Sequence, residues 1–334
     1  MVSSTAKPKQ KRLEWVDIAK GIAILLMVIG HELPMTSLIR MVIFSFHMPL
    51  FFILSGFTSR AVTSWTEIKR RVPRLLQIWC LAAIMIFLYE LECVILQQTS
   101  FIQALHLSLL GIFWGSNIGS LVSPGVMWFL FVFAWAKFLF EVCQLIFKKN
   151  QFILGPLVLL SAYVAYLVSQ HMWLPQAFDI VPIAILFMWF GYLLKRILHC
   201  LNNFSLGIIF IIAVLFWIFC IKHGLYLEMA TRRYPLFFVS ILEAVAGTIV
   251  CSIFSMVLSK IVFSNAFSFL GKHTLNIMCI HNLDLYKNWW APMLSTSTPW
   301  LAAGIRLLED LSILLLLFIG TKLFRRIKYK NQIL

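Results

Sequence analysis

Charged residues are scarce in this sequence. Asp, Glu, Lys and Arg make up 12% of the 334 residues, whereas hydrophobic residues make up 61% and the mean hydropathy is +0.90. A soluble domain typically carries about 25% charged residues. The apolar residues stand in continuous runs of about 20 residues, the length of a membrane-crossing helix, and not in the short alternating segments of a β-barrel. The composition excludes an ordinary soluble domain and predicts an all-α, polytopic integral membrane protein.

Regular cysteine patterns are also missing. The seven cysteines are scattered through apolar segments, and no CxxC motif or metal-ligand spacing is present. We therefore expect neither a disulfide framework nor a bound metal. The sequence has no GxSxG motif, so a serine-hydrolase mechanism is not expected. No soluble domain, low-complexity segment or clear repeat interrupts the chain, which we interpret as one domain over residues 1–334.

Acidic residues are outnumbered by basic ones, 13 against 28, so the net charge is +15. In a soluble protein this excess would suggest a nucleic-acid partner. Here the basic residues lie between apolar runs, so membrane topology explains them better and no nucleic acid is expected. The basic stretch before the first apolar run resembles a signal peptide, but Lys20 lies within that run and no small-residue cleavage site follows. We therefore expect a first helix that is retained.

About ten segments are apolar and long enough to be transmembrane helices. Basic tails at 1–13 and 324–334 flank them, and the segment 96–124, which lacks Lys and Arg, is interpreted as an outer loop. Ten spans place both termini on one side; if that side is cytoplasmic, twenty Lys and Arg residues fall in inner segments and six in outer ones. This ratio follows the positive-inside rule, and the segment from Lys222 to Arg233 is the exception. The expected spans are 14–33, 41–58, 75–95, 125–147, 152–169, 178–198, 204–222, 235–259, 268–285 and 300–323.

The first expected helix contains Asp17, Lys20 and His31. Lys20 and His31 are separated by three helical turns plus about 20° and a rise of about 16 Å, and Asp17 lies in the same sector. An intramembrane charge costs about 2.5–3.5 kcal/mol on insertion scales and usually faces a bundle interior or a wet cavity. We therefore expect this face to line a polar passage. Two simpler interpretations stay open: an interfacial ion pair between Asp17 and Lys20, and a helix end at which His31 reaches the outer headgroups.

Further motifs follow along the chain. The second expected helix contains FSFHMPLFFILSGF, in which His47 precedes Pro49, a residue that bends helices and frees a carbonyl group. Ser55 and Gly56 permit close helix approach. The motifs after this helix are RRVPRLL at 70–76, WFL at 128–130 after a Pro-Gly pair, and FLGKHTLNIMCIH at 269–281.

In order and spacing these motifs resemble the acyltransferase-3 family of bacterial membrane O-acyltransferases, especially its fucose 4-O-acetylase-like branch, over nearly the whole chain. The resemblance implies an enzyme of the bacterial cytoplasmic membrane that moves an acyl group, usually acetyl from cytoplasmic acetyl-CoA. The acceptor is a hydroxyl of a cell-surface polysaccharide or lipid-linked saccharide. Lys20 and His31 match the family's basic-X10-His motif, which is thought essential for catalysis. Many relatives have arginine where Lys20 stands, and lysine cannot make arginine's bidentate contacts.

Acyl transfer to a sugar hydroxyl needs a base for the hydroxyl proton and donors for the oxyanion. His31 is the candidate base, because imidazole has a pKa of about 6.5; a histidine that carries the acyl group covalently is the alternative. His47 and His281 are expected at a similar depth and are candidates for the same site. For each of these two, a hydrogen-bonded core histidine is an equally weighted interpretation.

The donor end is expected on the cytoplasmic side. Arg70, Arg71 and Arg74 are the candidates for binding the phosphates of acetyl-CoA, with Arg74 the deepest. The positive-inside rule alone would also place basic residues there. Acetyl-CoA is expected as a substrate, and no permanently bound cofactor is expected. Lys137 and Glu141 are interpreted as a structural i,i+4 ion pair, and no role is assigned to Glu243.

Two other functions remain open from the sequence. Polar residues at mid-membrane also mark transport paths, so a small-molecule or saccharide transporter is the alternative to an enzyme. A structural subunit of a glycan-synthesis complex would not require His31. Membrane lipid surrounds the chain in every case, and a homo-oligomer is compatible with the sequence.

Overall fold

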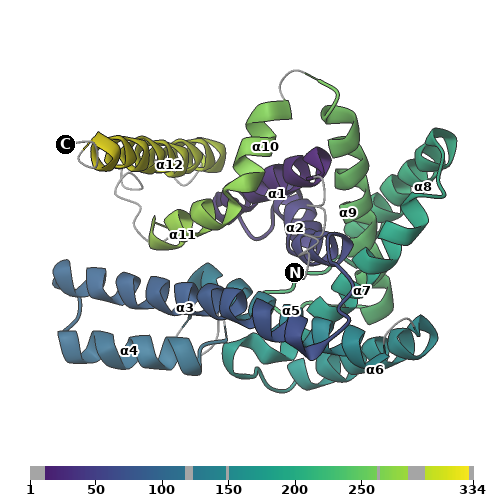
Figure 1. The fold of residues 1–334 in the computed structure, drawn as a ribbon, viewed down its shortest axis with the longest axis horizontal. Helices are drawn as coiled ribbons and strands as arrows, with labels where there is room; N and C mark the ends of the chain where they lie inside the picture. Colours follow the sequence, from purple (N-terminus) through teal and green to yellow (C-terminus); the bar gives the residue numbers. More distant parts are fainter. Residues whose placement is uncertain (1–11, 117–122, 148–149, 262–263, 285–297, 331–334) are drawn as a thin grey trace, which may run out of the picture.

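The computed structural model describes residues 12–116, 123–147, 150–261, 264–284 and 298–330. Within these ranges the chain forms twelve α-helices and two short 3-10 helices, which confirms the all-α prediction (Figure 1). The α-helices are α1 (Glu14–Glu32), α2 (Leu38–Phe57), α3 (Trp65–Ile95), α4 (Phe101–Phe113), α5 (Trp128–Phe147), α6 (Gln151–Ser169), α7 (Val181–Leu198), α8 (Asn203–Lys222), α9 (Phe237–Leu258), α10 (Ser264–Lys272), α11 (Thr274–Asp284) and α12 (Pro299–Lys330). The 3-10 helices are η1 (Gly125–Met127) and η2 (Pro175–Ile180).

Seven helical segments among the described residues are long and apolar enough to cross a membrane, so the chain is a multi-pass membrane protein. They contain α2, α3, α5, α6, α7, α8 and α9. Three of the ten expected spans are not among them. The expected spans 14–33 and 300–323 correspond to α1 and α12, and each of these two stretches carries four charged side chains, too many for an apolar span. The expected span 268–285 is divided between α10 and α11, which have 9 and 11 residues.

The segment 96–124, expected as an outer loop, contains a helix. Ser100 caps α4 by accepting a hydrogen bond from the Gln103 N–H, and the apolar residues after it continue the helix without a break. α4 packs beside α3 (Figure 1). It leaves apolar side chains exposed, such as Ile102, which is 80% exposed. Thirteen residues rise about 20 Å, which is too short to cross a bilayer. Residues 117–122 of this segment lie outside the described residues.

Glycines bring two helix pairs into backbone contact. A Cβ atom at Gly191 of α7 would lie 1.8 Å from the carbonyl oxygen of Ile53 in α2, and Gly56 of α2 meets the α7 backbone equally closely. A Cβ atom at Gly271 of α10 would lie 1.7 Å from the carbonyl oxygen of Asp17 in α1. Small residues allow such approach between membrane helices. These contacts hold α1 and α2, the helices with the expected site residues, close to their neighbours.

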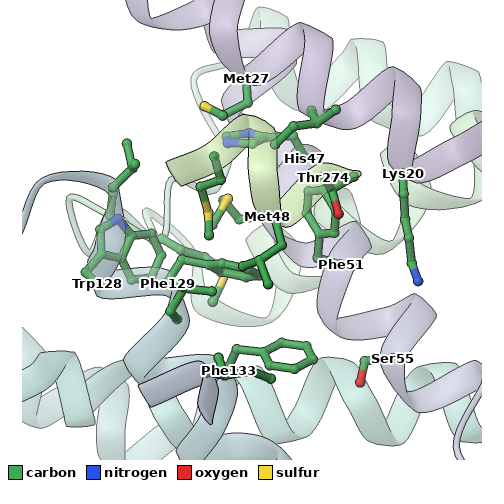
Figure 2. Close-up of a pocket in the computed structure, with 18 of the residues that line it drawn as sticks. Lys20, Met27, His47, Met48, Phe51, Ser55, Trp128, Phe129, Phe133 and Thr274 are labelled. Carbon is green, nitrogen blue, oxygen red and sulfur yellow. The ribbon is translucent and has the colours of Figure 1, made fainter. Parts of the chain in front are cut away.

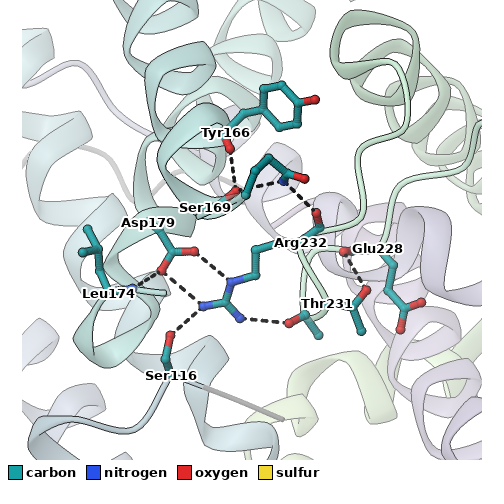
Figure 3. A network of polar contacts seen from close by, with 10 residues as sticks. Ser116, Tyr166, Ser169, Leu174, Asp179, Glu228, Thr231 and Arg232 are labelled. Atoms are coloured by element: carbon teal, nitrogen blue, oxygen red, sulfur yellow. Dashed lines mark hydrogen bonds and ion pairs between the residues drawn. The ribbon is translucent and has the colours of Figure 1, made fainter. Parts of the chain in front are cut away.

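The connection between α8 and α9 contains Arg232 and Arg233, two of the basic residues in the segment that departs from the positive-inside rule. Arg232 is 2% exposed at its side chain and donates to both carboxylate oxygens of Asp179, at 2.8 and 3.2 Å, and to Ser116 Oγ at 2.7 Å (Figure 3). Its guanidinium also lies 4.0 Å from the ring centroid of Trp173. The neighbouring Arg233 donates to a carbonyl oxygen within its own connection. Both arginines therefore serve internal contacts and are poor indicators of topology.

Candidate active site

A cavity of about 490 Å³ lies between α1, α2, α3, α5 and α11. Lys20, Arg74 and Lys137 line the end formed by the start of α1, the end of α2 and the start of α3. His31 and His47 line the opposite end, with Glu228 from the α8–α9 connection. Aromatic and methionine side chains form the walls between the two ends (Figure 2). The wall residues labelled there are Met27, Met48, Phe51, Trp128, Phe129 and Phe133.

The two histidines of the cavity have the same hydrogen-bond pattern. His31 Nδ1 lies 2.8 Å from the Met27 carbonyl oxygen, and His47 Nδ1 lies 2.9 Å from that of Ile43, each one turn back on its own helix. A carbonyl oxygen only accepts, so each Nδ1 carries a proton, and in the neutral imidazole the lone pair then lies on Nε2. The Phe44 ring lies against both, with centroid separations of 5.2 Å to His31 and 4.8 Å to His47. In their neutral form both imidazoles therefore present Nε2 as the basic nitrogen.

His281 does not line the cavity but packs against His31, with ring centroids 5.1 Å apart. Its Nδ1 lies 2.9 Å from Asp310 Oδ2, and both side chains are 0% exposed. One turn before Asp310 on α12, the fully buried Arg306 donates to Glu32 Oε1 at 2.8 Å. The expected group of three histidines is thus adjacent in the structure, but His281 is one step removed from the cavity.

The three arginines predicted to bind the phosphates of acetyl-CoA lie in different surroundings. Arg74 lines the cavity, whereas Arg71 Nη1 lies 2.9 Å from Glu141 Oε1 and Arg70 is exposed on α3. Lys137 does approach Glu141, at 3.7 Å, but it also donates to the Ser59 hydroxyl and lies on the cavity wall. The closest cation of Glu141 is therefore Arg71. Lys137 also lines the cavity, a position that the predicted i,i+4 ion pair with Glu141 did not indicate.

Asp17 is paired with a residue before the helix. Arg12 donates to both carboxylate oxygens of Asp17, at 2.5 and 3.0 Å. The hydrogen bond to Asp17 holds the pKa of Arg12 above its ordinary value. Asp17 does not line the cavity, whereas Lys20 and His31 of the same helix do. The polar face predicted for the first helix thus divides into an Arg12–Asp17 ion pair at its start and two cavity residues, Lys20 and His31.

The α8–α9 connection lines the histidine end of the cavity. Arg40 of α2 lies 3.1 Å from Glu228 Oε1, and the Arg40 guanidinium lies 4.0 Å from the Phe44 ring centroid. Glu243, to which the sequence assigned no role, accepts a hydrogen bond from the Leu227 N–H at 3.2 Å. Glu243 therefore holds the backbone next to Glu228 against α9.

Asp310, Arg306 and Glu228 were missed by the sequence interpretation. An ionisable residue in a membrane helix is by default a candidate for function. By that rule Asp310, which lies within the tenth expected span, is a candidate that the sequence alone could have shown. Among the described residues no group of three or more His, Cys, Asp or Glu side chains could hold a metal ion.

A family model described as an acyltransferase domain matches residues 13–324. The match covers every helix discussed above except the last residues of α12. No curated protein and no solved structure matches the chain.

Proposed function

Since the chain belongs to the acyltransferase-3 family, we propose that this membrane acyltransferase moves an acetyl group from cytoplasmic acetyl-CoA to a saccharide hydroxyl. The acceptor is a cell-surface polysaccharide or a lipid-linked saccharide, as the resemblance to the fucose 4-O-acetylase-like branch suggests. We place the enzyme in the bacterial cytoplasmic membrane, with about ten crossings and both termini in the cytoplasm. Seven apolar helices support the multi-pass arrangement, and the distribution of basic residues supports the orientation.

The observation that carries the proposal is a cavity with three basic side chains at one end and, at the other, two histidines whose Nδ1 atoms are held by backbone carbonyls. Lys20, Arg74 and Lys137 provide positive charge for the phosphates of acetyl-CoA at the cytoplasmic end. Arg70 and Arg71 belong to the same basic run, but the ion pair of Arg71 with Glu141 makes a structural role the better proposal for it. The apolar wall suits the pantetheine arm and the acetyl group, because it excludes water that would hydrolyse the thioester.

The chemistry follows from the tautomer of His31. Its Nε2 lone pair accepts the proton of the acceptor hydroxyl as the hydroxyl oxygen attacks the thioester carbonyl carbon. The tetrahedral intermediate then expels the CoA thiolate, the C–S bond breaks, and the proton on His31 passes to the thiolate. His47 lies close enough to share this role, and attack by the His31 lone pair itself would give the covalent route. In either route the reacting nitrogen is Nε2.

Acyl transfer by purified protein tests the proposal. The full chain in detergent micelles is incubated with radiolabelled acetyl-CoA and a panel of free and lipid-linked saccharides. We expect label in a saccharide with the wild type and a loss on the order of 100-fold or more for His31→Ala. His106→Ala is the matched control, because His106 is exposed on α4 and does not line the cavity.

Equal transfer by wild type and His31→Ala would contradict the role of His31. If the wild type transfers no label to any acceptor but moves solute across reconstituted vesicles, the transporter becomes the better explanation.

A further inference from the structure

The strongest feature that the proposed mechanism does not use is the buried pair of His281 and Asp310. His281 Nδ1 lies 2.9 Å from Asp310 Oδ2, and neither side chain has any exposed surface. His281 Nε2 and Asp310 Oδ1 have no hydrogen-bond partner within the part of the chain that the structure describes. A buried carboxylate is costly unless it is well paired. A buried Asp310 carboxylate is therefore better explained by a role in the reaction than by the contact between α11 and α12 alone.

The two arginines near the histidines are paired with other carboxylates. Arg40 forms an ion pair with Glu228 at 3.1 Å, and its guanidinium packs on the Phe44 ring. Arg306 lies 2.8 Å from Glu32 Oε1 and 3.8 Å from Glu309. Both arginines thus already face a carboxylate other than Asp310, and within the described part of the chain the ion-pair contact of Asp310 is with His281.

The orientation of His281 sets what this charge can do. A carboxylate that accepts from Nδ1–H fixes the tautomer in which Nε2 carries the lone pair. The negative charge of Asp310 also makes that lone pair more basic. The His281 ring lies 5.1 Å from the His31 ring, which itself lines the cavity. The His281 ring, polarised by Asp310, therefore packs against the imidazole that must become positively charged during acyl transfer.

We propose that Asp310 and His281 are positioning residues that stabilise the protonated form of His31 while it holds the acceptor proton. His31 takes the proton on Nε2, and its new positive charge faces a neutral imidazole backed by a carboxylate. The proton then leaves with the CoA thiolate, so His31, His281 and Asp310 return to their starting states. This inference rests on the proposed acyl transfer, and it assigns to the reaction a carboxylate from α12 that does not reach the cavity.

A double-mutant cycle with kinetics tests the inference. Asp310→Asn keeps the size and one acceptor oxygen but removes the charge, and we expect kcat to fall on the order of 100-fold with the KM for acetyl-CoA unchanged. His281→Gln should lose a similar factor, and the double variant should lose no more than either alone, because Asp310 acts through His281. Glu309→Gln is the matched control: it removes one negative charge from the adjacent position of α12, and kcat should stay within about twofold of the wild type.

Unchanged kcat in Asp310→Asn, an equal loss in Glu309→Gln, or additive losses in the double variant would each overturn the inference. Nitrogen NMR of protein labelled at histidine gives a test without turnover, with the His281 signal assigned from His281→Gln. We expect a protonated Nδ1 and an unprotonated Nε2 at His281 in the wild type. An unprotonated Nδ1 would overturn the pairing even in an active enzyme. Absence of acyl transfer in a wild type with the expected spectrum would instead contradict the proposed function.

Discussion

Arg71 and Arg74 belong to the same basic run and lie one turn apart on α3, yet they face different surroundings. Arg74 lines the cavity, whereas Arg71 is held by the buried carboxylate of Glu141. We predict that Arg74→Ala raises the KM for acetyl-CoA about tenfold, since it removes a phosphate contact of about 1.4 kcal/mol. Arg71→Ala should leave that KM within about twofold but lower the thermal unfolding midpoint, because Glu141 loses its closest cation.

The control for this prediction is the double variant Arg71→Ala with Glu141→Gln. It should recover part of the lost stability, because the buried carboxylate that lost its closest cation is itself removed. A large KM effect from Arg71→Ala and none from Arg74→Ala would reverse the assignment.

A second comparison between neighbouring residues concerns Arg232 and Arg233. Arg232 is buried against Asp179 and Ser116 (Figure 3) and also packs on the Trp173 ring, whereas Arg233 is exposed. We predict that Arg232→Ala destabilises the protein by about 3–5 kcal/mol, the cost of leaving one partner of a buried ion pair alone. Arg233→Ala should cost less than about 1 kcal/mol. Thermal unfolding in one detergent measures both, and equal midpoints for the two variants would show that the buried network is not what holds this connection.

At the scale of the helices, the crossing of α2 and α7 depends on residues without a side chain. A Cβ atom at Gly191 would lie 1.8 Å from a backbone oxygen of Ile53, so no rotamer change can relieve the overlap and the two helices must separate. We predict that Gly191→Ala lowers stability by about 1–3 kcal/mol. The control is Gly207→Ala on α8, where nothing lies within 4 Å of the added atom.

Gly207→Ala should leave the unfolding midpoint unchanged or raise it slightly, because alanine is a better helix former by about 1 kcal/mol. Since α2 carries His47, Gly191→Ala should also lower acyl transfer. A midpoint for Gly191→Ala equal to that of Gly207→Ala would contradict the close crossing.

For the whole molecule, the proposed topology places the α6–η2 turn outside and the α7–α8 turn inside. Each turn has an exposed residue suited to labelling, His171 in the first and Cys200 in the second. In a variant that lacks the other cysteines, Cys200 should react with a membrane-impermeant maleimide only after cells are opened. His171→Cys, with Cys200 also replaced, should react in intact cells, since the two turns flank one crossing of about 18 residues in α7. Labelling of Cys200 but not His171→Cys in intact cells would reverse the orientation.

The class of the protein was predictable because hydropathy is a local property of the chain. The all-α, multi-pass architecture is confirmed, as is membership of the acyltransferase-3 family. Length and composition identify seven apolar helices and not ten, because α1 and α12 carry too many charged residues to count as apolar spans. The face shared by Lys20 and His31 also followed from the sequence, since helical periodicity depends on spacing alone.

The tertiary structure alone decided which charged groups meet. Arg71 and Glu141 are 70 residues apart, and Arg306 and Glu32 are 274 residues apart. The spacing of residues along one helix cannot predict such contacts, because they depend on how separate helices cross. The same holds for Asp310, which the sequence shows only as a carboxylate in an apolar segment. Helix packing brings it to His281, and His281 to His31, and so gives the histidine of the first helix its surroundings.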